Sequence, residues 1–229
     1  MSSELVLAID NSLDFLNLAL AADGRLIEER HCRPSRPSSE VLPLLVSALL
    51  DSHGCSPRDL SLLVVSLGPG SFTGIRVALA FAKGVSSAVG LPLVGVPTLD
   101  VLARPLVGVT SSSICPLVDA KKGEVFFAQY QVEKGTLRRM TDYEAAGPED
   151  VARKLVRPTL VFGSGVRLCE PVLSGLEGIT LVTDGHQRIL GESLLRLGTE
   201  RYREGAPGVV KPVYGRKSEA EIKFHLTVT

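Results

Sequence analysis

The chain has 229 residues, of which 45% are hydrophobic and 22% charged, a composition typical of a globular protein with ample core-forming side chains. Lysine plus arginine equals aspartate plus glutamate at 25 each, so the formal net charge is zero. Proteins that hold nucleic acid mainly by themselves carry an excess of positive charge. The balance therefore predicts that any nucleic-acid role is shared with a partner.

The four cysteines, Cys32, Cys55, Cys115 and Cys169, show no C-x-x-C spacing and predict free thiols in a reducing compartment. The first residues lack the basic region of a signal peptide. The longest apolar run, residues 41–50, contains a proline and is too short to span a bilayer. We expect a cytoplasmic protein that does not enter a membrane.

The first hundred residues predict three strands, then a helix, a strand, a helix and a strand, at 5–9, 15–20, 25–32, 38–50, 61–66, 72–88 and 91–96. The Asp23-Gly24 pair is a hairpin turn signal between the second and third strands. Ser38 or Ser39 is the expected N-cap of the first helix. Strands that alternate with helices predict a mainly parallel sheet, to which the hairpins add antiparallel strands.

The second half of the chain starts the same pattern again. A strand at 114–118 ends at Asp119, as the strand at 5–9 ends at Asp10. The later expected strands are 124–130, 136–140 and 159–162, and the expected helices are 150–156 and 187–202. We interpret this weak repeat as two lobes that face each other across a cleft. The first is residues 1–100 and the second is 101–229, with a C-terminal segment able to pack back on the first.

Two lobes with an aspartate at the first turn of each resemble the actin, sugar-kinase and chaperone ATPase superfamily. This resemblance implies an α/β, ribonuclease-H-like fold with mixed sheets flanked by helices. In that superfamily the turns cradle nucleotide phosphates, which requires small residues so that backbone N–H groups can approach. The superfamily pattern is Asp-x-Gly-Thr. Here the first turn reads Asp10-Asn11-Ser12-Leu13, and Lys121-Lys122-Gly123 occupies the second.

Two interpretations of these turns stay open. Asp10, Ser12 and Asp119 form either a vestigial nucleotide site that only builds the fold, which we favour, or a competent one. In the second case the chain is an ATPase or phosphotransferase that positions a metal with Asp10 and Asp119.

A glycine-rich turn follows the strand at 61–66. Gly68 and Gly70 let the chain leave the strand sharply, and Ser71 is placed to cap the next helix. On physical grounds alone this is a well-made strand-to-helix turn.

The run SLGPGSFTGIRVALAFAKG, residues 66–84, and its continuation over 91–99 resemble the family of the tRNA threonylcarbamoyladenosine biosynthesis protein TsaB. The stretches at 7–10, 42–44, 119–126 and 212–214 resemble that family in order and spacing. The resemblance covers nearly the whole chain, strongly over 1–130 and loosely over 135–205. It implies a catalytically silent relative of the transferase that moves threonylcarbamoyl onto N6 of the adenosine beside the anticodon.

The resemblance also implies partners. Family members bind and activate the transferase subunit, work with a small ATPase subunit, and pair with themselves when alone. We expect no catalytic residue, no firmly bound cofactor, and ATP only within the complex. His31, His53, His186 and His225 include no His-x-x-x-His pair, so we expect no metal site. A histidine that opens the first helix in the family is replaced here at Pro37 or Ser38.

The helices at 38–50 and 72–88 are apolar on almost every side, more than one sheet face can cover. They form either a partner surface, which we favour, or a mutual core contact. The residues we assign to the partner surface are Val41, Leu45, Ala48, Phe72, Ile75, Ala78, Leu79 and Ala82.

A modest basic stretch lies near the C-terminal end, at Arg201, Arg203, Lys211, Arg216 and Lys217. It either touches tRNA within a complex or is a solvated tail, which we favour. We expect the chain to contact tRNA mainly through its partners.

Overall fold

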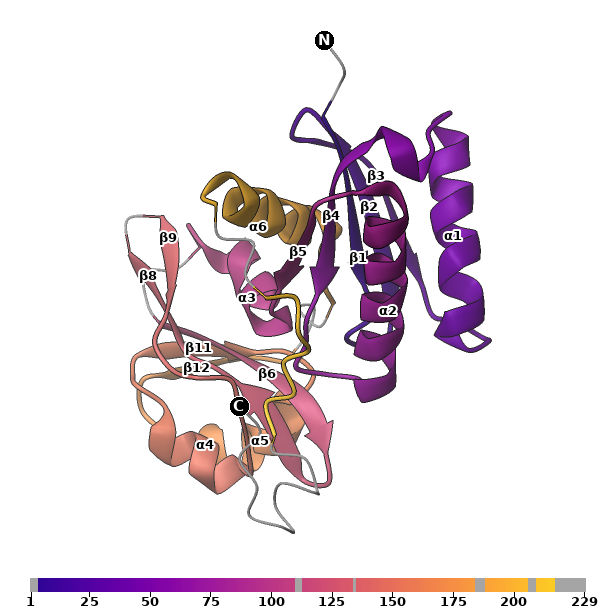
Figure 1. Ribbon diagram of the computed structural model, residues 1–229. Helices are drawn as coiled ribbons and strands as arrows, with labels where there is room; N and C mark the ends of the chain where they lie inside the picture. The colour runs from indigo at the N-terminus through magenta and orange to yellow at the C-terminus, as the bar shows by residue number, and fades with distance from the viewer. Residues whose placement is uncertain (1–3, 110–112, 134, 184–187, 206–208, 217–229) are drawn as a thin grey trace.

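Two mixed β-sheets, one from each half of the chain, organise the molecule (Figure 1). The computed structural model describes residues 4–109, 113–133, 135–183, 188–205 and 209–216. The first sheet has the order β3-β2-β1-β4-β5 and comprises β1 (Leu5–Asp10), β2 (Leu16–Ala22), β3 (Arg25–Cys32), β4 (Leu60–Ser66) and β5 (Leu93–Val96). Its first three strands are antiparallel, and β1, β4 and β5 are parallel. Asp23 and Gly24 have φ of 49° and 76°, as a tight hairpin turn requires.

The second sheet repeats this arrangement. Its order is β10-β7-β6-β11-β12, and its strands are β6 (Ser113–Lys121), β7 (Glu124–Phe127), β10 (Glu144–Ala146), β11 (Thr159–Phe162) and β12 (Ile179–Val182). Again the first three strands of the path are antiparallel and the last three parallel. A hairpin of β8 (Tyr130–Glu133) and β9 (Thr136–Arg139) extends from β6. The repeat confirms the predicted α/β fold of two lobes, with mixed sheets flanked by helices.

Helices fill three layers around the two sheets (Figure 1). On the outer face of the first sheet lie α1 (Ser38–Ser52) and α2 (Phe72–Val89). Between the sheets lie α3 (Thr98–Ala103) and α6 (Gly191–Arg203), and the outer face of the second sheet carries α4 (Pro148–Lys154) and α5 (Val166–Leu173). Short 3₁₀ turns span Pro57–Asp59 and Arg104–Leu106. Three buried apolar clusters hold these layers together: one under α1 and α2, one that runs from the first sheet through α3 and α6 to the second sheet, and one under α4 and α5.

The helix α6 comes from the second half of the chain but packs on the first sheet. A Cβ added to Gly198 would lie 2.3 Å from Val64 Cγ1, and one added to Gly191 would lie 2.4 Å from Ala19 Cβ. These two glycines therefore let the helix backbone approach β4 and β2 closely. Residues 209–216 then run past the first lobe, where the Val213 N–H donates to the Leu67 carbonyl at 2.8 Å.

A buried carboxylate joins the two halves beside α6. Asp100 of α3 accepts hydrogen bonds from the hydroxyls of Tyr130 (2.7 Å) and Tyr143 (2.8 Å), and from Arg201 Nη2 (2.7 Å). Burial, together with the Asp100 charge, raises the pKa of both tyrosines, so both phenols stay protonated and act as donors. Tyr130 and Tyr143 belong to the second lobe, and Arg201 belongs to α6. Asp100 therefore connects α3 both to the second lobe and to α6.

The structure corrects several element boundaries. Pro37, not Ser38 or Ser39, occupies the N-cap of α1, and no side chain caps that helix. The strand expected at 124–130 ends at Phe127, because the buried Gln129 side chain bonds to the backbone of Val156. The helices expected at 150–156 and 187–202 lie at Pro148–Lys154 and Gly191–Arg203. The short elements α3, α5, β10 and β12 were not predicted.

Candidate functional site

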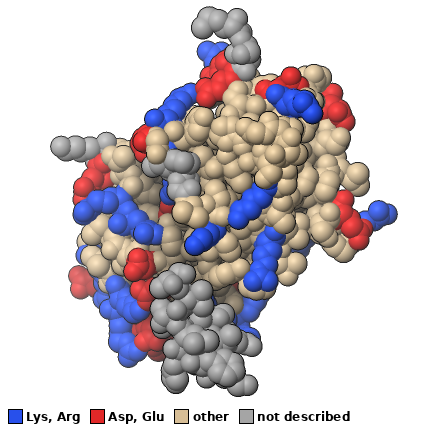
Figure 2. Space-filling view, in the orientation of Figure 1, with Lys and Arg blue, Asp and Glu red and all other residues tan. Residues whose placement is uncertain are grey.

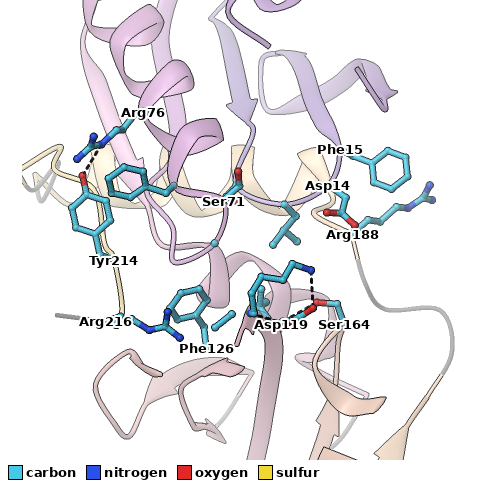
Figure 3. Close-up of a pocket in the computed structure, with 17 residues that line it drawn as sticks. Asp14, Phe15, Ser71, Arg76, Asp119, Phe126, Ser164, Arg188, Tyr214 and Arg216 are labelled. Atoms are coloured by element: carbon cyan, nitrogen blue, oxygen red, sulfur yellow. Dashed lines mark hydrogen bonds and ion pairs between the residues drawn. The ribbon is translucent and has the colours of Figure 1, made fainter. Parts of the chain in front are cut away.

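A cleft of about 950 Å³ opens between the two lobes (Figure 3). The first lobe lines it with Ser12, Leu13, Asp14, Phe15, Gly70, Ser71, Phe72 and Arg76. The second lobe contributes Val118, Asp119, Ala120, Lys121, Phe126 and Ser164, and the C-terminal part contributes Arg188, Tyr214 and Arg216. The volume lies within the range of ligand-binding cavities.

The glycine-rich turn forms one wall of the cleft. Gly68 and Gly70 have φ of 92° and 156°, in the region that favours glycine. A Cβ on Gly70 would lie 2.0 Å from the Ser12 carbonyl oxygen, so the turn packs directly on the first hairpin. The Ser71 hydroxyl caps α2 by accepting from the Gly74 N–H at 3.2 Å.

Asp10 is buried behind the cleft and does not line it. Its Oδ1 accepts from the Ser12 N–H (3.0 Å) and hydroxyl (2.5 Å), and its Oδ2 accepts from Asn17 Nδ2 (2.7 Å). Both carboxylate oxygens therefore stabilise the hairpin of β1 and β2. The register of these two strands places Asp10 opposite Asn17. Hydrogen bonds of this kind, made within the hairpin, are expected if Asp10 and Ser12 stabilise the fold.

Asp119 does line the cleft, but it is held by its own turn. Its Oδ1 accepts from the Lys121 N–H at 2.8 Å, and its Oδ2 pairs with Lys121 Nζ at 2.7 Å. Burial raises the pKa of Asp119, but the hydrogen bonds and charge of Lys121 outweigh it and leave the pKa lowered. Lys121, Lys122 and Gly123 have positive φ of 62°, 55° and 77°, so the turn is tight.

Aromatic and guanidinium groups gather at the mouth of the cleft (Figure 3). The Arg76 guanidinium lies 3.7 Å from the centroid of the Phe72 ring, and Arg76 Nε donates to the Tyr214 hydroxyl at 3.2 Å. The rings of Phe72 and Tyr214 are 5.3 Å apart. Arg216 forms an ion pair with Glu124 of the second lobe. Sequence reasoning missed this cluster, although Tyr214 belongs to one of the stretches that carry the family resemblance.

The structure corrects half of the predicted partner surface. Ile75, Ala78 and Ala82 are fully buried and Leu79 nearly so, all within the core cluster under α2. These four side chains face the first sheet and cannot contact a partner. Of the other predicted residues, Phe72 and Ala48 are exposed, and Val41 and Leu45 are half-buried.

The exposed sides of α1 and α2 form one surface, here called the outer helical face. Its members are small or apolar, apart from two cations: Val41, Leu44, Leu45, Ala48, Phe72, Arg76, Val77, Ala80, Phe81, Lys83, Gly84 and Ala88. Leu44 is 68% exposed and was not predicted. In Figure 2 the surface over these helices is mostly uncharged, with only a few lysine or arginine side chains. By length and composition α2 could cross a membrane, but its buried side chains pack on the sheet.

The predicted basic stretch is not a free patch. Arg201 pairs with Asp100, Arg203 with Glu4, and Arg216 with Glu124. Lys211 is exposed, and Lys217 lies outside the described residues. Three of the five positive charges are therefore compensated within the chain, because the segment packs along both lobes.

In the described part of the chain, no group of three or more His, Cys, Asp or Glu side chains is arranged to hold a metal ion. The four cysteines are free, as predicted. His31 contacts Asn17 Oδ1 through Nδ1 and pairs with Glu29 at 2.8 Å through Nε2. At the position of the family histidine, the Ser38 hydroxyl lies 3.4 Å from Asn11 Oδ1, beside the first hairpin.

Comparison with known proteins decides the family. A family model described as TsaD, tRNA N6-adenosine threonylcarbamoyltransferase, matches residues 33–159. The tRNA threonylcarbamoyladenosine biosynthesis protein TsaB of Bacillus subtilis is 30% identical over 227 residues, which cover 96% of this chain and 97% of that protein. The chain belongs to the TsaB family. The TsaB protein of Escherichia coli is 28% identical, over 94% of this chain and 96% of its own length.

Solved structures show the same fold as this TsaB-family chain. A Pseudomonas aeruginosa protein described as similar to peptidase YEAZ superposes with a TM-score of 0.79 at 25% identity, covering 93% of this chain and all of that one. YeaZ from Pseudomonas aeruginosa gives a TM-score of 0.76 at 24% identity, over 92% of this chain and 99% of that one. The agreement covers 92–93% of this chain, so it extends over both lobes.

Proposed function

We propose that the chain is a non-catalytic, cytoplasmic accessory subunit for threonylcarbamoyladenosine formation at the tRNA adenosine beside the anticodon. It binds and activates the transferase subunit through the outer helical face, and it works with a small ATPase subunit. Family membership supports the tRNA-modification role. The docking role rests on one observation in particular, the glycine at position 84 of α2.

Gly84 lies inside an 18-residue helix, where glycine costs about 1 kcal/mol relative to alanine. Most glycines that approach neighbouring elements in this fold would clash if they carried a side chain. At Gly84 a Cβ would meet nothing within 4 Å among the described residues, so none of them requires glycine there. A partner helix that packs closely on α2 would require it, because small residues let two helix backbones approach.

The neighbours of Gly84 fit the same purpose. Ala80 and Ala88 are exposed small residues on the same side of α2 as Gly84. Ala48 is an exposed small residue on α1. Leu44 and Phe72 supply larger apolar groups, 68% and 53% exposed, at which a partner can bury substantial area. Contiguous apolar surface of this kind marks protein–protein contact. The same face is available to a second copy of the chain, so the isolated protein is expected to pair through it.

The substitution Gly84→Gln tests the docking role. Glutamine is a better helix former than glycine, so the isolated chain should keep or slightly raise its melting temperature. The added side chain should prevent close helix packing and weaken association with the native transferase at least tenfold. Sedimentation velocity and calorimetry measure both effects.

Gly175→Gln is the matched control, because a Cβ at Gly175 of the second lobe also meets nothing within 4 Å. This variant should bind the transferase as the wild type does. Wild-type affinity in Gly84→Gln would refute docking on the outer helical face. Equal weakening in both variants would show that the effect is not specific to α2.

The non-catalytic role predicts that the isolated chain neither hydrolyses nor tightly binds ATP. Both carboxylate oxygens of Asp10 accept hydrogen bonds, from Ser12 and Asn17. Leu13 occupies the position in this turn at which phosphate binding requires a small residue. Calorimetry with magnesium and ATP should show no micromolar binding by the chain alone. Micromolar affinity that disappears in a folded Asp10→Asn variant would overturn this part of the proposal, as would tRNA modification by the chain without a second subunit.

A further inference from the structure

The cleft between the lobes has an excess of positive charge. Four cations line it, Arg76, Lys121, Arg188 and Arg216, against two carboxylates, Asp14 and Asp119. Lys121 and Arg216 pair with carboxylates, at Asp119 and Glu124. Among the described residues, no carboxylate forms an ion pair with Arg76, which bonds only to a neutral phenol, or with Arg188. Arg76 and Arg188 lie at opposite ends of the cleft, with Asp14 beside Arg188 (Figure 3), and neither guanidinium group forms an ion pair among the described residues.

Exposed aromatic rings accompany these cations. Phe15 is 39% exposed on the side of Arg188, and Phe72 is 53% exposed on the side of Arg76, next to Tyr214. Leaving such rings in water is unfavourable, and planar bases stack on them. An alternation of aromatic rings and guanidinium groups along a groove is the composition that binds unpaired nucleotides.

The cleft is poorly suited to a nucleoside triphosphate with its metal. Asp10 is buried away from the cleft and already accepts three hydrogen bonds, and Asp119 is paired with Lys121. Neither carboxylate is free to hold a divalent cation. The phosphodiesters of a nucleic-acid strand carry one charge each and need only cations and N–H donors. Leu13, which obstructs a phosphate cradle, is compatible with a stacked base.

We propose that the inter-lobe cleft binds a short unpaired segment of RNA. One base stacks on Phe15 and another on Phe72 and Tyr214, and the intervening phosphates lie between Arg188 and Arg76. The contact is small, consistent with a chain of zero net charge that shares the RNA with its partners. The inference rests on the proposed role in tRNA modification. The cleft shares Phe72 and Arg76 with the outer helical face, so the test uses cleft residues that lie outside that face.

The test uses the full chain, alone and with the transferase subunit, and a fluorescein-labelled transfer RNA transcript that carries the target adenosine. The variants are Arg188→Gln and Phe15→Leu, both across the cleft from α2. Arg58→Gln is the control, since Arg58 is an exposed arginine beside the start of β4, at the opposite end of that strand from the cleft. Anisotropy is measured from low to moderate salt, and sedimentation reports complex formation separately.

Loss of one phosphate contact should lower the salt slope of log K by about 0.7 in Arg188→Gln. Loss of one stacked base should weaken RNA binding at least about fivefold in Phe15→Leu. Complex formation should be unchanged in both variants, and Arg58→Gln should bind RNA as the wild type does. Wild-type slope and affinity in both cleft variants would overturn the inference, even if the transferase still docks. So would displacement of the RNA by millimolar AMP or ATP, which would make the cleft a mononucleotide site.

Discussion

Ala78→Glu is expected to unfold the first lobe. Ala78 is fully buried between α2 and the first sheet, so the new carboxylate would lie in an apolar cluster without a partner. A buried unpaired charge costs several kcal/mol even after relaxation, and the extra atoms add about 1–3 kcal/mol of overpacking. A domain of ordinary stability has about 5–15 kcal/mol in total. Circular dichroism and thermal melting should show a large loss of folded protein.

Ala80→Glu is the matched control for this result, because it places the same side chain two residues further along the same helix. Ala80 is exposed on the outer helical face. Its variant should melt close to the wild type yet bind the transferase poorly. A folded Ala78→Glu protein with a normal melting temperature would contradict the placement of α2 on the sheet.

Asp100→Ala should be the most damaging loss of a polar group. It removes the only carboxylate that joins Arg201 to the Tyr130 and Tyr143 hydroxyls among the described residues. Removing one partner of such a buried charged group costs about 3–5 kcal/mol, because the remaining groups lose their hydrogen bonds without regaining water. We expect a lowered midpoint in urea unfolding, and α6 should become more sensitive to proteases.

Asp150→Ala gives the comparison for that measurement. Asp150 pairs with Arg153 on the exposed side of α4, and an exposed pair contributes at most about 1 kcal/mol. The midpoint of this variant should stay close to that of the wild type. If Asp100→Ala behaved in the same way, the α3–α6 junction would not be a significant source of stability.

The order of elements and the repeat of the two lobes could be predicted because both depend on local patterns. Apolar strands that end at Asp10 and Asp119, and the Asp23-Gly24 turn, are readable within a few residues of sequence. The turn at Gly68 and Gly70 was also predictable, since strand exit and helix cap are local features. The role of Asp10 follows from the same hairpin, which sets Asn17 opposite it.

The inward face of α2 was not predicted correctly, because this helix is apolar almost all round. Thr73, Arg76, Lys83 and Ser87 are polar, and they recur at helical spacing on the outward side of α2. Those polar positions could have excluded Ala78 and Ala82 from the partner surface. A C-terminal segment was expected to be able to pack back on the first lobe, but its identity as α6 could not be predicted. That packing depends on contacts such as Gly198 with Val64, which are far apart in the chain.

Hydrogen exchange with and without the native transferase tests the central claim, that the outer helical face docks this partner. Docking on this face should slow amide exchange in peptides that cover Ser38–Ser52 and Phe72–Val89, because both helices lose access to water and to opening motions. Exchange in α4 and α5, on the far side of the second sheet, should be unchanged. A complex that forms with protection confined to the second lobe, and none in α1 or α2, would show that the transferase docks elsewhere.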